Sequence, residues 1–71
     1  MTHLERANEI VEEAIRIRDT YSGCHSLPST VYDIIQLRKA LIKKPESAKS
    51  ILDCMEYAIA HIRKTVGILK T

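Results

Sequence analysis

The last third of the chain carries the pattern that most constrains its fold. Between residues 48 and 70, apolar residues recur in alternating steps of four and three, as in the a and d positions of a coiled-coil heptad. The pattern predicts one helix about 35 Å long, at 1.5 Å per residue, with a continuous apolar seam. This seam consists of Ala48, Leu52, Met55, Ile59, Ile62, Val66 and Leu69.

Two further apolar residues, Ile51 and Ala58, lie on one flank of the seam at 100° per residue. They make the apolar arc too broad for one partner helix and favour packing against two. A core helix this long in so short a chain suggests that part of its surface binds another protein.

Composition narrows the fold further. The chain has 71 residues, no Trp, no Phe and three Tyr, so its core must be built from aliphatic side chains. Aliphatic side chains suit helices that pack by interdigitation. A domain of this size buries only about 60% of the surface that its unfolded chain exposes, so it should be marginally stable alone.

Two earlier helices precede the long one. Thr2 and Glu5 form a T-x-x-E capping box, which predicts a helix over residues 3–21. Gly23 is a candidate C′ residue for that helix, and Pro28 marks the next stop or the next first turn. Thr30 with Asp33 resembles a second capping box, so the second helix is expected over residues 29–43.

A second break falls at Pro45, which a helix tolerates only in its first turn. The third helix is therefore expected over residues 46–70. The sequence predicts a single all-α domain over residues 1–71, either a small antiparallel helical hairpin or a three-helix bundle with a long C-terminal helix.

Charge and cysteine content limit the environment and the partners. The net charge of +2 is too small to indicate nucleic acid, although the first half is acidic and the second half basic. Two Cys are too few for a secreted disulfide framework, and no apolar run reaches the length of a membrane span. We expect a cytoplasmic protein with no membrane association.

Cys and His are the usual zinc ligands, so their presence suggests a zinc site, but their spacing in this sequence disfavours one. Cys54 and His61 lie seven residues apart, about 10 Å along a helix, whereas one ion needs its ligands within about 2.3 Å. In an up-down-up bundle, Cys24 lies near the end of His61 and away from Cys54. We expect no metal, no cofactor and no Cys24–Cys54 disulfide; His25 is expected to be solvated.

Other chemistry has little support. Ala60-His61 followed by Lys64 resembles the A-H-x-x-K pattern of histidine phosphotransfer domains, but the chain is too short for their four-helix bundle. No nucleophile elbow or glycine-rich phosphate loop is present, so no enzyme and no catalytic residue are expected.

A basic run on either side of Pro45 leaves two interpretations open. It could grip phosphates in a helix-turn-helix, or it could be a solvated face or a docking face for an acidic protein. No aromatic residue is interleaved for stacking, and nucleic acid is not expected. The run consists of Arg38, Lys39, Lys43, Lys44 and Lys49.

Small and polar residues occupy the rest of the third helix. Ala60 and Gly67 lie one heptad apart opposite the seam, which indicates either a plain surface or the close approach of a second element. Cys54, His61 and Ile68 form a further row at the edge of the apolar arc that a partner could also use.

The two ends of the chain resemble a known family. The opening Met1-Thr2-His3-Leu4-Glu5 is similar to the M-T-x-L-E start of small co-chaperones of the type III secretion needle subunit. The stretch Glu56-Tyr57-Ala58-Ile59-Ala60-His61-Ile62, then Gly67-Ile68-Leu69-Lys70, is similar to their E-x-A-I-A-x-I and G-x-L-K. The resemblance covers about a third of the chain.

This resemblance implies a cytoplasmic, non-catalytic helical protein. Such co-chaperones pair with a larger tetratricopeptide-like chaperone, and the pair holds the needle subunit as a soluble monomer in a heterotrimer. The family is described as a hairpin, whereas two prolines here predict two breaks. The alternative is a small homodimeric DNA-binding or regulatory protein. The expected protein-binding residues are Leu52, Met55, Ile59, Ile62, Val66 and Leu69.

Overall fold

A computed structural model describes residues 2–21, 23 and 26–70. For residues 69 and 70 it describes the helical backbone and not the side chains. Within this part, all regular structure is helical: α1 (His3–Thr20), α2 (Leu27–Lys43), a short 3₁₀ turn η1 (Pro45–Ser47) and α3 (Ala48–Lys70). The predicted all-α fold with a long C-terminal helix is confirmed, and it takes the form of a three-helix bundle.

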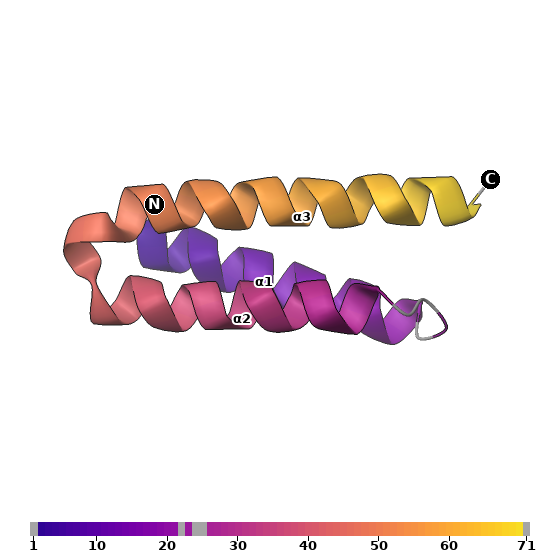
Figure 1. Cartoon of the computed structure of the whole chain (residues 1–71), viewed down its shortest axis with the longest axis horizontal. Helices are drawn as coiled ribbons and strands as arrows, with labels where there is room; N and C mark the ends of the chain where they lie inside the picture. The colour runs from indigo at the N-terminus through magenta and orange to yellow at the C-terminus, as the bar shows by residue number, and fades with distance from the viewer. Residues whose placement is uncertain (1, 22, 24–25, 71) are drawn as a thin grey trace.

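The three helices lie side by side in an elongated bundle of 40 × 17 × 15 Å (Figure 1). The chain runs up α1, down α2 and up α3, so α1 and α3 are parallel and both start at the same end of the bundle. Each helix packs against the other two. The family resemblance implies a hairpin of two helices. This chain has three long helices instead, because α2 is a separate helix between α1 and α3.

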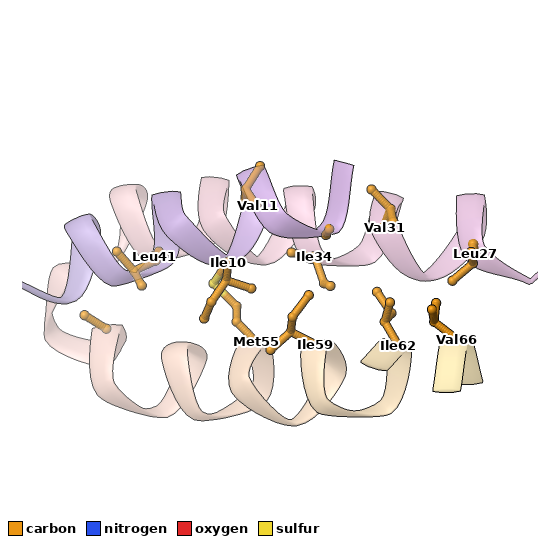
Figure 2. Close-up of a cluster of buried hydrophobic side chains, with 13 residues drawn as sticks. Ile10, Val11, Leu27, Val31, Ile34, Leu41, Met55, Ile59, Ile62 and Val66 are labelled. Atoms are coloured by element: carbon orange, nitrogen blue, oxygen red, sulfur yellow. The ribbon is translucent and has the colours of Figure 1, made fainter. Parts of the chain in front are cut away.

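One apolar stripe from each helix builds the core (Figure 2). The stripe of α3 points between α1 and α2, and no buried polar or charged residue interrupts the core in the described part. At about 25 cal/mol per Å² of buried apolar surface, this core is the main source of stability. The buried residues are Ala7, Ile10, Val11, Ala14, Leu27, Val31, Ile34, Leu41, Ala48, Met55, Ile59, Ile62 and Val66.

The start of α1 follows the predicted cap. Thr2 has extended backbone angles, and its hydroxyl accepts a hydrogen bond of 3.1 Å from the amide of Glu5. This bond satisfies one of the amides that a helix start leaves unpaired. At the other end the Tyr21 amide bonds the Ile17 carbonyl, and Gly23 does not adopt a positive φ. Because the C-cap of α1 is Tyr21, Gly23 does not occupy the C′ position that the sequence suggested.

The start of α2 differs from the sequence prediction. The helix begins at Leu27 after an N-cap Ser26, with Pro28 in its first turn. Proline fits there because its fixed φ is helical and its missing N–H is one that the first turn leaves unpaired. The second capping box at Thr30 is therefore wrong: Thr30 already lies inside the helix, and its hydroxyl donates to the Ser26 carbonyl at 3.2 Å.

The connection between α2 and α3 consists of Lys44 and a short 3₁₀ turn. Lys44 caps α2, and Pro45 opens the 3₁₀ turn η1, in which the Ser47 amide bonds the Lys44 carbonyl at 2.9 Å. Pro45 thus lies in a first turn, as predicted, but that turn belongs to η1, and α3 itself begins at Ala48 rather than at residue 46. This turn reverses the chain and brings the start of α3 beside the start of α1 (Figure 1).

Candidate protein-binding surfaces

The seam of α3 faces inward. Met55 and Ile59 are fully buried, Ile62 is 1% exposed and Val66 is 8% exposed, all within the core of this one chain. Leu52 is half-buried against the same core, and the side chain of Leu69 lies outside the described residues. In this arrangement a partner protein cannot contact the buried four unless the helices separate.

Both halves of the broad apolar arc are filled from within. Both α1 and α2 pack against α3, and the partly buried Ile51 and Ala58 pack against the same core. The prediction that the arc suits two helices is therefore met by the chain's own α1 and α2. Among the described side chains, the apolar seam of α3 therefore leaves no large exposed residue for a partner protein, and any such residue lies elsewhere on the molecule.

Two bidentate ion pairs join the parallel helices α1 and α3. The Arg6 guanidinium donates to both oxygens of Glu56 at 2.9 and 2.7 Å, and Arg63 donates to both oxygens of Glu13 at 2.6 Å each. The two pairs lie one heptad apart, and each joins residues separated by 50 positions. A bidentate geometry is directional, so the pairs favour one register of α1 against α3.

These contacts shift the ionisation of both carboxylates. The hydrogen bond from Arg63 lowers the pKa of Glu13 below its usual value, and that from Arg6 does the same to the pKa of Glu56. Partial burial opposes both shifts. Because all four side chains keep 29–50% of their surface exposed, water screens the pairs and their role is mainly to select the register.

The side of α3 that faces away from the core carries a second row of residues. We call Tyr57, His61, Lys64 and Ile68 the outer row; they recur at steps of four, three and four along the helix. Tyr57 is 79% exposed and Ile68 is 67% exposed. Tyr57, His61 and Lys64 surround the small side chain of Ala60 in a shallow depression of about 250 Å³.

Gly67 lies beside this row. Apart from its chain neighbours and the adjacent backbone of α3, no described atom comes within 4 Å of the position that a Cβ would occupy on Gly67. Within residues 2–21, 23 and 26–70, no element thus makes the close approach to Gly67 that the spacing of Ala60 and Gly67 suggested. The other interpretation of this spacing, a plain surface, agrees with the open space beside Gly67.

A second opening lies at the end of the bundle where α1 and α3 start. A cavity of about 330 Å³ opens there between the start of α1 and the joint that follows α2. We call it the end pocket. Most of its lining is aliphatic, and it consists of Thr2, His3, Leu4, Leu41, Ile42, Pro45 and Ala48.

The groups considered for metal or phosphoryl chemistry are not brought together. Within the described part, no three His, Cys, Asp or Glu side chains are placed to hold a metal ion. Cys54 is free and exposed on α3, while Cys24 and His25 lie outside the described residues. His61 is exposed beside Lys64, but three helices replace the four of a phosphotransfer domain.

The basic run divides between faces. Lys39, Lys43, Lys44 and Lys49 are exposed, whereas Arg38 is half-buried and its guanidinium donates to the Asn8 amide oxygen at 3.2 Å. These cations therefore lie toward one end of the bundle rather than along a single recognition helix, a distribution that disfavours a helix-turn-helix.

We also compared the chain with known proteins. Comparison with protein-family models, with curated proteins and with solved structures found no significant match. None of the helices in the described part has the length and apolar content needed to cross a membrane. The fold defines the class, a small three-helix bundle, and the function has to be argued from the surface.

The end pocket was not predicted from the sequence. Leu4 and Ile42 are apolar residues of α1 and α2, yet they are 41% and 53% exposed. The useful signal was their proximity to helix ends, where fewer neighbouring turns are available to cover a side chain. The lining residues come from the start of α1, the end of α2, η1 and the start of α3, and only the fold brings them together.

Proposed function

We propose that the chain is a non-enzymatic protein-binding module that acts in the cytoplasm. In its most specific form, it pairs with a larger helical-repeat chaperone, and the two proteins keep a type III secretion needle subunit soluble before export. The resemblance in sequence motivates this form of the proposal. The surface that we assign to the partner is the outer row of α3.

The exposure of Tyr57 is the observation that carries the proposal. A tyrosine with 79% of its surface exposed, in the middle of a regular helix, contributes little to the fold. At protein interfaces, tyrosine contributes a large rigid contact area with a polar tip, and it is among the residues enriched in binding hot spots. The small Ala60 beside it leaves room for a side chain of the partner.

The family-like stretch divides cleanly between the two sides of the helix. Ile59 and Ile62 serve the core, while Tyr57, Ala60 and His61 face outward. A partner that binds this stretch of the intact bundle therefore contacts its exposed side chains and not the buried ones. This moves the proposed contact from the seam to the outer row.

The test is reconstitution with defined partners. The chain is produced together with the helical-repeat chaperone and the needle subunit encoded by the same organism, and the mixture is analysed by size exclusion with light scattering. We expect a complex with one copy of each protein. Absence of any complex with the chaperone would overturn the co-chaperone role.

A matched pair of substitutions locates the contact. Tyr57→Glu should abolish the complex, because it places a charge in the centre of the proposed interface. Tyr32→Glu is the control, since Tyr32 is 62% exposed on α2 rather than on α3. Both variants should keep the helical circular dichroism of the unchanged chain. Equal binding by the two variants would exclude the outer row as the contact surface.

A further inference from the structure

We infer that the end pocket binds an acidic segment of a partner protein, with one large apolar side chain of that segment seated in the pocket. The end pocket opens where α1 and α3 start and does not include any residue of the outer row. The inference is therefore independent of the proposed co-chaperone role.

The shape of the pocket suits a single aliphatic or aromatic anchor. Leu41 and Ala48 are 4% and 8% exposed and form its floor, while Leu4 and Ile42 are 41% and 53% exposed and form its walls. A volume of about 330 Å³ lies at the small end of the range of ligand pockets. Filling it would remove from water two of the large exposed apolar side chains of the bundle.

The charged residues next to the pocket lining carry a net positive charge, three lysines against two glutamates. Lys43, Lys44 and Lys49 are exposed, and each is the chain neighbour of a lining residue, against Glu5 and Glu46 on the acidic side. In the described part of the chain, none of these three lysines forms an ion pair with a carboxylate. Their charge is thus available to a partner.

Two other features add to the positive potential. α1 and α3 both begin at this end and direct the positive ends of their dipoles toward the pocket, whereas only α2 ends there (Figure 1). Arg38 lies one turn from Ile42, and its described hydrogen bond is to the neutral amide of Asn8. An acidic segment would therefore meet complementary charge on the rim.

Other occupants fit less well. Duplex DNA has no protruding apolar group to fill the cavity. A second copy of the chain offers the acidic outer face of α1, but the large exposed apolar residue described on α1 is Leu4, which lines the pocket itself. An acidic segment with an apolar anchor satisfies both the cavity and its rim.

The experiment measures fluorescence anisotropy of a short labelled peptide in which central leucines are flanked by glutamates. We expect saturable binding that weakens with salt, because exposed charges are screened. Matched probes are the same peptide with lysines for glutamates, the peptide with serines for leucines, labelled duplex DNA and anionic vesicles. The inference requires that the acidic leucine peptide binds at least about tenfold more tightly than each of these.

Variants place the binding in the pocket. Ile42→Glu should weaken binding about tenfold or more by removing an apolar wall and adding repulsion, and Lys44→Glu with Lys49→Glu should weaken it and flatten its salt dependence. Lys64→Glu and Tyr57→Glu, on the outer row, are controls that should leave it unchanged.

Several results would overturn the inference. They are no binding up to millimolar peptide, equal binding by the lysine peptide, tighter binding by DNA or vesicles, or binding unaffected by Ile42→Glu. Self-association that Ile42→Glu abolishes would assign the pocket to a second copy instead. Because the outer-row variants are tested separately, failure here leaves the co-chaperone proposal intact, and failure of that proposal leaves this one.

Discussion

Tyr57 and Ile59 are two positions apart on α3, yet 79% of the first is exposed and none of the second. Successive residues of a helix are rotated by about 100°, so this short step crosses from the outer face to the core. The residues that stabilise the fold and those that we propose for partner binding therefore alternate along the same few turns.

Substitution at these two positions should separate folding from binding. We expect Ile59→Ala to lower the free energy of unfolding by about 2–5 kcal/mol, because it leaves a cavity in a closed core. Tyr57→Ala should change it by no more than about 0.5 kcal/mol. Urea unfolding followed by circular dichroism measures both. Comparable losses from the two substitutions would mean that the outer row also supports the fold.

The ion pairs predict a dependence of stability on pH. Hydrogen bonds from arginine lower the pKa of Glu13 and of Glu56 in the folded state. A lowered folded pKa gives stability that is present above the unfolded pKa and lost as pH falls through the folded pKa. We therefore expect the free energy of unfolding to fall between about pH 5 and pH 3.

The control for this prediction uses matched carboxylates. Glu13→Gln with Glu56→Gln should flatten the loss below pH 5 and lower stability at neutral pH by about 0.5–2 kcal/mol in total. Glu12→Gln with Glu46→Gln removes two exposed carboxylates and should keep the pH profile. Identical profiles for the two double variants would show that the pairs contribute nothing measurable.

At the scale of the helices, α1 and α2 begin in different ways. α1 starts with a side-chain cap from Thr2, while α2 starts through Pro28, with no side-chain cap bond from Ser26. The same T-x-x-acid pattern thus marks a helix start at Thr2 and an interior position at Thr30. Pro28 accounts for the difference. It lies in a first turn that begins at Leu27, so the helix has already started before Thr30.

Threonine substitutions test this difference. Thr2→Ala should cost about 1 kcal/mol, since it leaves the Glu5 amide without its cap. Thr30→Ala should change stability by less than about 0.5 kcal/mol, because only a hydroxyl bond within the helix is lost. Thermal unfolding of both variants at one concentration measures the difference. A larger loss at Thr30 would restore it as a capping residue.

The whole molecule closes its core within one chain. Stripes from α1, α2 and α3 bury one another. In the described part, the large apolar side chains that stay exposed lie in the outer row, at the end pocket and, for Tyr32, apart on α2. A bundle of this size supplies about 3–5 kcal/mol of stability, so its folded state should respond strongly to any partner.

Thermal unfolding across a hundredfold range of concentration tests this expectation, together with sedimentation equilibrium. We expect a monomer with a concentration-independent melting temperature. A specific partner at about 100 times its Kd should add ~2.7 kcal/mol and raise the melting temperature by roughly 10–20 °C. A melting temperature that rises with concentration in the isolated chain would favour the homodimeric regulator.

Much of the fold was predictable because its signals are local. The heptad spacing of the seam, the cap at Thr2 and the break at Pro45 each depend on residues within a few turns of one another, and all three appear in the structure. The register of α1 on α3 was not predictable. Arg6–Glu56 and Glu13–Arg63 each join residues 50 positions apart, and many other charge pairings were possible in the sequence.

The sequence by itself determined that the chain forms three amphipathic helices and that α3 carries the longest apolar face. Only the tertiary structure decided what covers that face, namely α1 and α2, and which apolar residues stay exposed. The physical reason is range. Helix formation depends on hydrogen bonds and side chains four residues apart, whereas burial of Ile59 or exposure of Ile42 depends on helices that meet from distant parts of the chain.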